Sequence, residues 1–405
     1  MAKKKRSHTD DLRGATRLAV EATKGVTDVV EAMHHVIGGG PPILGRPLAG
    51  AVRLFTAPVY WSIRAVTQLV GGSLDVALAQ LAPLLGESAP GPVRGAVIAA
   101  LNGVLGDHLS ESGNPLAIEM LLHHEGHALE LEREALRAAI PAATTKALVF
   151  VHGSCMSVEQ WKRGELDLGG SLARDLGYTP IHVQYNSGLH ISTNGRAFDA
   201  LLEQLVSSWP EPIDELSIVA FSMGGLVTRS ACHYADAAGH AWRTKQRKLL
   251  FVGTPHHGAP LERGGNWVQV LLGISPYSAP LARLGKIRSA GVTDMRFGNL
   301  LDEHWHGRDR FALGEDRRTP VPLPAGVECF AIAGTTAAAE RESLPGDGLV
   351  PVSSALGRHE RPELAVQFSE ENQWIGYGMG HLDLLYRAEV YEVLRSWLAR
   401  STATP

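Results

Sequence analysis

The chain has 405 residues, of which 44% are hydrophobic and 20% are charged, and its formal net charge is −4 at pH 7. This composition is typical of a soluble globular protein and excludes a disordered chain or a collagen-like repeat. Phosphate binding needs a basic face, so the near balance of charges excludes nucleic acid as an expected partner. The length allows one catalytic domain and a smaller domain.

The cysteines and the N-terminal residues indicate the cellular compartment of the protein. Cys155, Cys232 and Cys329 lie far apart and show no metal-ligand spacing. Three cysteines cannot all pair, so we expect no disulfide framework and a reducing compartment. The basic run Lys3 to Arg6 begins the chain, but acidic residues follow where a signal peptide would be apolar. The sequence therefore predicts a cytoplasmic protein.

The first 115 residues are predicted to form a helical module. From Leu12 to Val36 the apolar residues recur every three or four positions, which indicates an amphipathic helix. Pro47 to Leu85 is more apolar, but charged residues cut it into runs shorter than the roughly 20 residues that a membrane span requires. A further helix is expected from Val93 to Leu109.

Two roles remain open for this helical module. Its apolar stripes can pack on one another or on the catalytic domain, as such stripes usually do. Alternatively, an apolar face can lie on a membrane surface, which would make this cytoplasmic protein peripheral to the membrane. No targeting motif in the sequence decides between these two roles.

Residues 116 to 405 are predicted to form an α/β catalytic domain. Short apolar runs alternate here with helical patterns, which is typical of a mostly parallel sheet flanked by helices. A short antiparallel hairpin, Met120–His124 and Ala128–Leu131, is expected at the sheet edge. The expected parallel strands are Leu148–Val151, Pro180–Gln184, Leu216–Phe221, Leu249–Val252 and Cys329–Ala333. Helices are expected around Leu172, Leu201 and Val227 and from Leu384 to Leu398.

The alternation of strands and helices breaks between about residues 255 and 325. This interval carries many apolar and aromatic residues but no clear strand, so we interpret it as an inserted helical lid. A lid of this kind forms much of the pocket that holds an acyl chain. Trp267, Leu271 and Tyr277 are therefore the candidate substrate-binding residues within it.

Ser222 is the candidate nucleophile. It follows an apolar strand and precedes a helical pattern, within the sequence Ala220-Phe221-Ser222-Met223-Gly224-Gly225. This is the strand–turn–helix context of a nucleophile elbow, in which small neighbours at Ala220 and Gly224 let the strand and the helix approach closely. The pattern alone arises by chance in many chains, so the expectation rests on this context.

A serine hydroxyl needs a base to remove its proton and a carboxylate to orient that base. The hydrolase order of serine, acid and histidine places the base late in the chain, and His381 precedes the last predicted helix. Asp347 lies between two glycines after the strand Cys329–Ala333 and is the candidate acid. Asp302 and Glu328 are weaker alternatives for the acid.

Attack on an ester creates an oxyanion that needs preorganised N–H donors. The backbone N–H of Met223, the residue after the nucleophile, meets one requirement. The second donor is expected in the loop after the first parallel strand, where the backbone N–H of Ser154 is the candidate. We expect His152 and Gly153 to shape this loop and not to take part in acid–base chemistry.

Together these motifs resemble the bacterial lipase and esterase branch of the α/β-hydrolases, including the GPI inositol-deacylase-like group. The matching segments, in chain order, are Val151–Gly153, Ala220–Gly225, Gly253–Gly258, Asp347–Pro351 and Gly380–His381. They span residues 117 to 400 and leave the helical module unexplained. The resemblance implies hydrolysis of acyl esters through an acyl-enzyme, without a metal or an organic cofactor. We assign no catalytic role to His256 and His257.

Two other patterns are set aside. The segment His123–His127 clusters histidines with a carboxylate, but neighbouring residues on a strand point to opposite faces. The zincin motif instead needs two histidines one turn apart on a helix. Cys155 lies beside the expected oxyanion loop but lacks an elbow, so we interpret it as a small apolar filler. We therefore expect neither a metal site nor a cysteine nucleophile.

The sequence therefore predicts a serine esterase or lipase that acts on a small-molecule or lipid acyl ester. The same triad can transfer the acyl group to an alcohol or a thiol, or hydrolyse a thioester, and the sequence does not separate these reactions. A lipid-binding scaffold without catalytic activity is the alternative from another class. The retention of all three triad candidates in the hydrolase order favours an enzyme.

Overall fold

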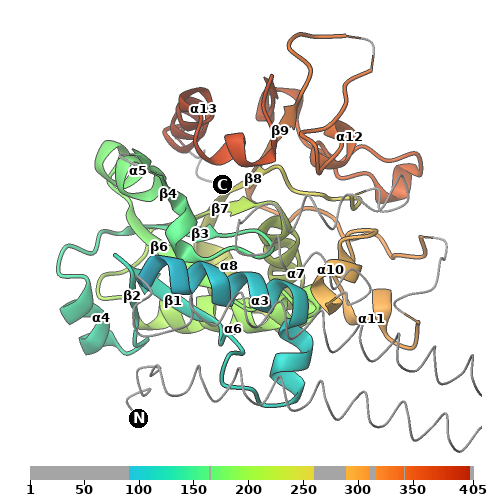
Figure 1. The fold of residues 1–405 in the computed structure, drawn as a ribbon. Coiled ribbons are helices and arrows are strands. Elements are labelled where there is room, and N and C mark those ends of the chain that lie inside the picture. Colours follow the sequence, from blue (N-terminus) through green and yellow to red (C-terminus); the bar gives the residue numbers. More distant parts are fainter. Residues whose placement is uncertain (1–90, 164–165, 260–288, 310–315, 342, 402–405) are drawn as a thin grey trace, which may run out of the picture.

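The computed structural model describes residues 91–163, 166–259, 289–309, 316–341 and 343–401. In this part of the chain, helices flank one large sheet on both faces (Figure 1). The predicted helix Leu12–Val36 and the apolar stretch Pro47–Leu85 lie outside the described residues, and so does much of the predicted lid. These expectations therefore stay predictions, as does the division into two domains.

The strands of the large sheet are β1 (Leu121–His124), β2 (His127–Ala128), β3 (Lys146–Val151), β6 (Thr179–Gln184), β7 (Glu215–Phe221), β8 (Gln246–Val252), β9 (Glu328–Thr335) and β10 (Gln373–Tyr377). Their order in the sheet is β10-β9-β8-β7-β3-β6-β1-β2. Neighbours from β10 to β6 are parallel, and the hairpin of β1 and β2 forms an antiparallel edge on β6. Two short strands, β4 (Lys162–Arg163) and β5 (Leu166–Asp167), pair separately. The predicted α/β fold class, a mostly parallel sheet flanked by helices, is confirmed.

Helices pack on both faces of the sheet. Those that the structure describes are α3 (Gly91–Glu111), α4 (Arg133–Ala139), α5 (Leu168–Leu176), α6 (Ile191–Ser208), α7 (Met223–Ala238), α8 (Trp242–Lys245), α10 (Ala290–Asp294), α11 (Asp302–Trp305), α12 (Val352–Ala355) and α13 (Ala388–Leu398). Successive side chains of a strand point to opposite faces. In β3, Val149 and Val151 therefore pack in one core with residues of α6 and α7. Leu148 and Phe150 pack in a second core with residues of α5 and α13.

The predicted parallel strands are confirmed, and three details differ. Strand β10 was not predicted, because its sequence Gln-Trp-Ile-Gly-Tyr carries a polar residue and a glycine among its apolar residues. The second strand of the edge hairpin ends at Ala128 and does not reach the predicted Leu131. The last helix begins at Ala388 and not at Leu384, because the segment His381–Leu385 forms a separate turn of 3-10 helix.

Helix α3 confirms the helix that the sequence predicts from Val93 to Leu109. Its residues from Val97 to Gly106 are all buried, so no face of this stretch is left in water. A helix that is buried on all sides is part of a core and not an amphipathic surface helix. Hydrogen bonds join it to later parts of the chain: Ser289 Oγ donates to Gly103 O at 2.6 Å, and Asn186 Nδ2 donates to Gly106 O at 2.8 Å.

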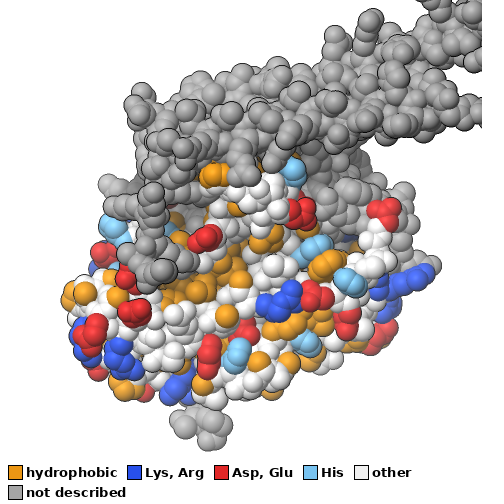
Figure 2. Space-filling model, turned by 90° about the horizontal axis from the view of Figure 1, so that it is seen from below, with side chains coloured by type: hydrophobic (Ala, Val, Ile, Leu, Met, Phe, Trp, Pro, Cys, Tyr) orange, Lys and Arg blue, Asp and Glu red, His pale blue; other side chains and the backbone are white. Residues whose placement is uncertain are grey.

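Within the described residues, no helix combines the length and the apolar character that a membrane crossing requires. On the face shown in Figure 2, Lys and Arg side chains lie among Asp and Glu side chains, and hydrophobic atoms gather toward the middle of the described part. This interspersed pattern agrees with the nearly balanced composition of the chain.

Candidate active site

The candidate site residues lie in the loops that follow the carboxyl ends of the parallel strands. The register places Phe221 at the end of β7 beside Val252 at the end of β8. From β3 the chain continues to β6 on one side and later to β7 on the other, so the connections reverse between β3 and β7. In open α/β sheets, ligands bind at such a reversal, outside the carboxyl ends of the strands. Ser154 and Ser222 follow the ends of these two strands.

Ser222 lies at the sharp turn between β7 and α7. Its backbone has φ 52° and ψ −125°, and positive φ is uncommon for a residue other than glycine. Its N–H donates to Val252 O at 2.8 Å, which ties the turn to β8. A Cβ on Gly224 would lie only 2.4 Å from Val151 O, so glycine is needed for α7 to approach β3 this closely. Met223, the first residue of α7, follows the serine in the chain and is buried.

His381 and Asp347 form a buried pair. His381 Nδ1 lies 2.7 Å from Asp347 Oδ2, and the two side chains are 4% and 0% exposed. The other carboxylate oxygen accepts the N–H groups of Leu349 at 2.9 Å and Val350 at 2.8 Å. A carboxylate is an acceptor only, so the proton of the imidazole lies on Nδ1 and leaves Nε2 as an acceptor. Gly346 allows the tight turn, because a Cβ there would lie 1.9 Å from Val350 O.

The imidazole of His381 lies beside the elbow. Its ring centroid is 4.8 Å from that of Phe221, the residue before Ser222. A Cβ on Gly253 would lie 3.2 Å from His381 Cε1, and Gly253 follows the residue whose carbonyl accepts the Ser222 N–H. Among the described residues, His381 Nε2 is buried without a hydrogen bond, so the hydrogen bond between serine and histidine that a triad needs is not made here. Such bonds are often long in unliganded enzymes and shorten when substrate binds.

The loop after β3 reaches the same place. A Cβ on Gly153 would lie 3.1 Å from Ser222 Cβ, and Ser154, the next residue, is buried. His152 stacks on Tyr185 with ring centroids 4.3 Å apart, and Tyr185 Oη donates to His152 O at 2.8 Å. Burial lowers the pKa of His152 to about 4, so its imidazole is neutral near pH 7. His152 therefore supports the loop as a neutral side chain.

Tyr185 was not among the residues that the sequence analysis singled out. It follows the predicted strand Pro180–Gln184 directly, so its place at the carboxyl edge of the sheet could have been inferred. Ser187, two residues later, was also missed, and its Oγ accepts the N–H of Cys155 at 3.0 Å. The sequence carries no signal for that contact, because it joins two different loops.

The alternative acids lie away from His381. Asp302 begins α11, where its carboxylate accepts a hydrogen bond from Ser192 Oγ at 2.6 Å and also pairs with Arg196. Glu328 is the first residue of β9, at the strand end opposite the site. Among the three candidate acids from the sequence, Asp347 is the one that the structure brings to His381.

His256 and His257 lie in the loop after β8 and are held by arginines. Burial and the nearby Arg229 guanidinium keep the pKa of His256 well below its usual value. Burial lowers the pKa of His257 to about 4. Arg318 Nη1 donates to His256 O at 3.1 Å, so this cluster fixes the loop through its backbone. The expectation that neither histidine is catalytic stays a prediction.

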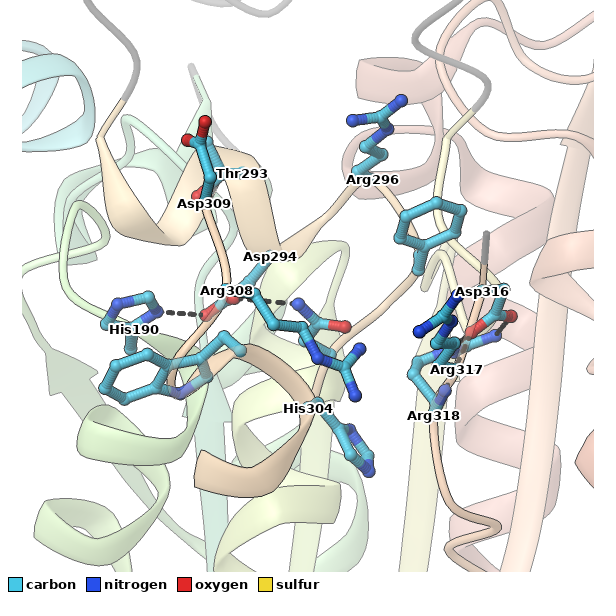
Figure 3. A pocket seen from close by; sticks show the side chains of 13 residues that line it. His190, Thr293, Asp294, Arg296, His304, Arg308, Asp309, Asp316, Arg317 and Arg318 are labelled. Atoms are coloured by element: carbon cyan, nitrogen blue, oxygen red, sulfur yellow. Dashed lines mark hydrogen bonds and ion pairs between the residues drawn. The ribbon is translucent and has the colours of Figure 1, made fainter. Parts of the chain in front are cut away.

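A polar pocket of about 320 Å³ lies beyond this loop (Figure 3). Several of its polar side chains are paired with one another. His190 Nδ1 lies 2.9 Å from Asp294 Oδ2, and Arg318 Nη2 lies 2.8 Å from Asp316 Oδ2. None of the triad candidates lines it. Its lining consists of His190, Thr293, Asp294, Arg296, Phe297, Asn299, His304, Trp305, Arg308, Asp309, Asp316, Arg317 and Arg318. A lining this rich in charge does not suit an acyl chain.

The predicted acyl pocket lies outside the described residues. Trp267, Leu271 and Tyr277 all fall within 260–288, which the structure does not describe. The described remainder of the lid interval contains the short helices α10 and α11. The role of these three side chains therefore stays a prediction.

Comparisons with known proteins give a family model and several solved structures. A model described as a domain of unknown function (DUF7379) matches residues 189–294, which is less than half of the chain and includes Ser222. No curated protein matches the chain.

Three solved structures illustrate the structural likeness. The mature lipase BlEst2 of Bacillus licheniformis is 18% identical, with a TM-score of 0.41, 64% of this chain covered and 93% of that one. Lipase B of Aspergillus fumigatus is 13% identical, with a TM-score of 0.41 and coverages of 70% and 57%. EstA of Clostridium botulinum is 11% identical, with a TM-score of 0.41 and coverages of 65% and 89%. The fold assignment rests on the strand order described above and not on these likenesses.

We predict that the native cysteines are unreactive at pH 8. Burial raises the pKa of Cys155 to about 11 and that of Cys232 to about 12, so both remain protonated thiols below those values. Cys329 is also buried with a raised pKa. Ellman's reagent should therefore titrate no thiol rapidly in the native protein and three in guanidinium chloride. Fast modification of one native cysteine with loss of activity would reopen the cysteine-nucleophile interpretation.

We predict from the pairing of Asp347 with His381 that Asp347→Asn lowers kcat. Asp347→Asn keeps the shape of the side chain but offers an amide, which no longer fixes the proton on Nδ1 of the histidine. Loss of the correct tautomer costs about 10⁴-fold in kcat in enzymes with such a pair. The matched control is Asp214→Asn, because Asp214 is exposed. Ester hydrolysis by both variants should be compared at neutral pH, and equal rates would remove Asp347 from the site.

Proposed function

We propose that the protein is a serine hydrolase that cleaves an apolar or lipid-like carboxylic ester through Ser222, His381 and Asp347. The observation that carries this proposal is the buried His381–Asp347 pair beside a serine with positive φ at a strand–helix turn. Strained backbone of this kind persists where the surroundings hold it in place, and it clusters at functional sites. The order of the three residues in the chain also supports the proposal.

In the first step, His381 acts as the general base. Its Nε2 takes the proton of Ser222 Oγ while the serine oxygen attacks the ester carbonyl carbon. The imidazolium that forms keeps its Nδ1–H directed at Asp347 Oδ2, at the 2.7 Å separation of the pair. Because both side chains are buried, this charge-assisted hydrogen bond stabilises the imidazolium more than it would in water.

The negative charge on the carbonyl oxygen is stabilised by backbone N–H groups. In the proposed mechanism these belong to Met223, at the N-terminus of the long helix α7, and to Ser154. The positive end of the α7 dipole adds to the stabilisation. Removing one such donor typically costs about 10²–10³-fold in kcat.

The reaction then passes through an acyl-enzyme. The histidine returns its proton to the leaving alcohol, and the carbonyl re-forms as the acyl ester of Ser222. In the second half, His381 deprotonates a water that attacks this ester, and the serine leaves with the proton. Each proton transfer uses groups of the chain, substrate or water, so the proposed steps need no cofactor.

Hydrolysis of a p-nitrophenyl ester series from short to long acyl chains tests this proposal. Loss of the nucleophile in Ser222→Ala should lower kcat on the order of 10⁶-fold. The matched control is Ser207→Ala, because Ser207 is exposed on α6 and its hydroxyl bonds only within that helix, to Gln204 O. The chain length that gives the highest kcat/KM separates an esterase from a lipase.

Two outcomes would contradict the proposal. Equal hydrolysis by wild type and Ser222→Ala would exclude Ser222 as the nucleophile. Absence of turnover with every ester in the series, together with no labelling by an active-site phosphonate, would favour a scaffold without catalytic activity. Product analysis in the presence of a competing alcohol would show acyl transfer as a second product.

A further inference from the structure

Helix α3 lies directly against the loop that carries the proposed oxyanion donor. A Cβ on Gly103, in the middle of α3, would lie 2.2 Å from Cys155 Sγ, 2.9 Å from its Cα and 3.1 Å from its Cβ. Distances below 3.0 Å are not tolerated, so one of the two segments would have to move. Cys155 is the residue after Ser154, and a displacement of Cys155 therefore moves the Ser154 peptide.

Cys155 is held in a conformation that its surroundings must impose. Its φ is 59°, which makes it one of three residues other than glycine with positive φ in the described part of the chain. Its N–H donates to Ser187 Oγ at 3.0 Å, and its side chain is fully buried. Its thiol takes no part in the proposed chemistry, because burial keeps it protonated. The remaining role for this residue is geometric.

The same helix also contacts the loop that supplies Ser187. A Cβ on Gly188 would lie 2.2 Å from Asn102 O, and a Cβ on Gly106 would lie 1.9 Å from Asn186 Oδ1. The Asn186 side chain donates to Gly106 O at 2.8 Å, which fixes its orientation. Helix α3 thus packs against the loops after β3 and β6 together, and the hydrogen bond from Cys155 to Ser187 joins these two loops.

We propose that Gly103 of α3 is a positioning residue for the oxyanion hole. This inference rests on the proposed function, in which the Ser154 N–H stabilises the oxyanion. The absence of a side chain at Gly103 lets the helix backbone pack on Cys155 and hold it in place at positive φ. A fixed Cys155 restricts the movement of the adjoining Ser154 backbone, which carries the proposed N–H donor. Catalysis by preorganised donors depends on such placement, and a shift of about 1 Å can cost about 10²-fold.

The experiment compares Gly103→Ala with Gly95→Ala in the full chain. Both glycines lie in α3 and both substitutions gain the same helix propensity, but a Cβ on Gly95 meets no atom within 4 Å. We expect Gly95→Ala to keep the wild-type kcat. Gly103→Ala should lose about 10²-fold in kcat with KM changed less than about threefold, because the donor matters most in the transition state.

A rescue separates positioning from general loss of packing. In the double variant Gly103→Ala with Cys155→Gly, the Sγ contact at 2.2 Å and the Cβ contact at 3.1 Å are removed, and Cα remains at 2.9 Å, so most of the clash is relieved. Glycine also adopts φ 59° without strain. The loss of kcat that Gly103→Ala causes in the Cys155→Gly variant should be at least about tenfold smaller than the loss that it causes in the wild type. Thermal unfolding of all variants, followed by circular dichroism, shows whether each one is folded at the assay temperature.

The outcomes distinguish this inference from the proposed function. Wild type that hydrolyses esters while Gly103→Ala matches Gly95→Ala would overturn the inference and leave the proposed function standing. A folded Gly103→Ala with low kcat that Cys155→Gly does not rescue would also overturn it, since the effect would then not pass through Cys155. Wild type that neither hydrolyses any ester nor reacts with a phosphonate would remove the proposed function and this inference together.

Discussion

The structure of the candidate site depends on the close backbone approach at the β7–α7 turn. Ser222 has positive φ, and the helix that follows passes so near β3 that a Cβ on Gly224 would lie 2.4 Å from Val151 O. A turn held this tightly presents the serine side chain at the carboxyl edge of the sheet and begins a helix behind it. Other parts of the site meet this turn from neighbouring strands, so the parallel register decides which loops can contribute.

The partner of the imidazole divides the histidines of this region into two kinds. His152, His256 and His257 are buried with lowered pKa values, and they act as neutral supports for backbone carbonyls and neighbouring loops. His381 is buried as well, but it alone among these has a carboxylate, that of Asp347, on Nδ1. A partner of this kind is what allows an imidazole to accept a proton in a site closed to water. The environment, and not the residue type, therefore singles out His381.

Much of the fold and the order of the triad candidates could be predicted from the sequence. The central strands are continuous apolar runs because both of their faces are covered, and such runs can be recognised in the sequence alone. Strand β10 could not be predicted, since Gly376 and polar Gln373 interrupt its apolar residues. Asp347 could be predicted because two glycines mark a turn at the right point of the chain order.

Contacts between distant segments could not be predicted in the same way. Gly103 shows in the sequence only as a glycine within a helical pattern, which normally weakens a helix. Its purpose becomes visible when the helix is placed against Cys155, because the missing Cβ is what makes room for the loop. Periodicity reports which face of a helix is apolar, but it carries no information about what that face touches.

The glycines Gly103, Gly153 and Gly224 have one physical property in common. At each of them an added Cβ would meet another segment of the site at about 3 Å or less. Gly153 brings its loop close to side-chain atoms, among them Ser222 Cβ. Gly103 and Gly224 instead bring their helices close to backbone atoms of Cys155 and Val151. Backbone contacts of this kind are stiff because interiors are close-packed. Stiffness is what a site needs if it stabilises a developing charge with fixed N–H groups. On this argument Gly103 helps to position the loop of the proposed oxyanion donor, even though its helix precedes the first strand of the sheet.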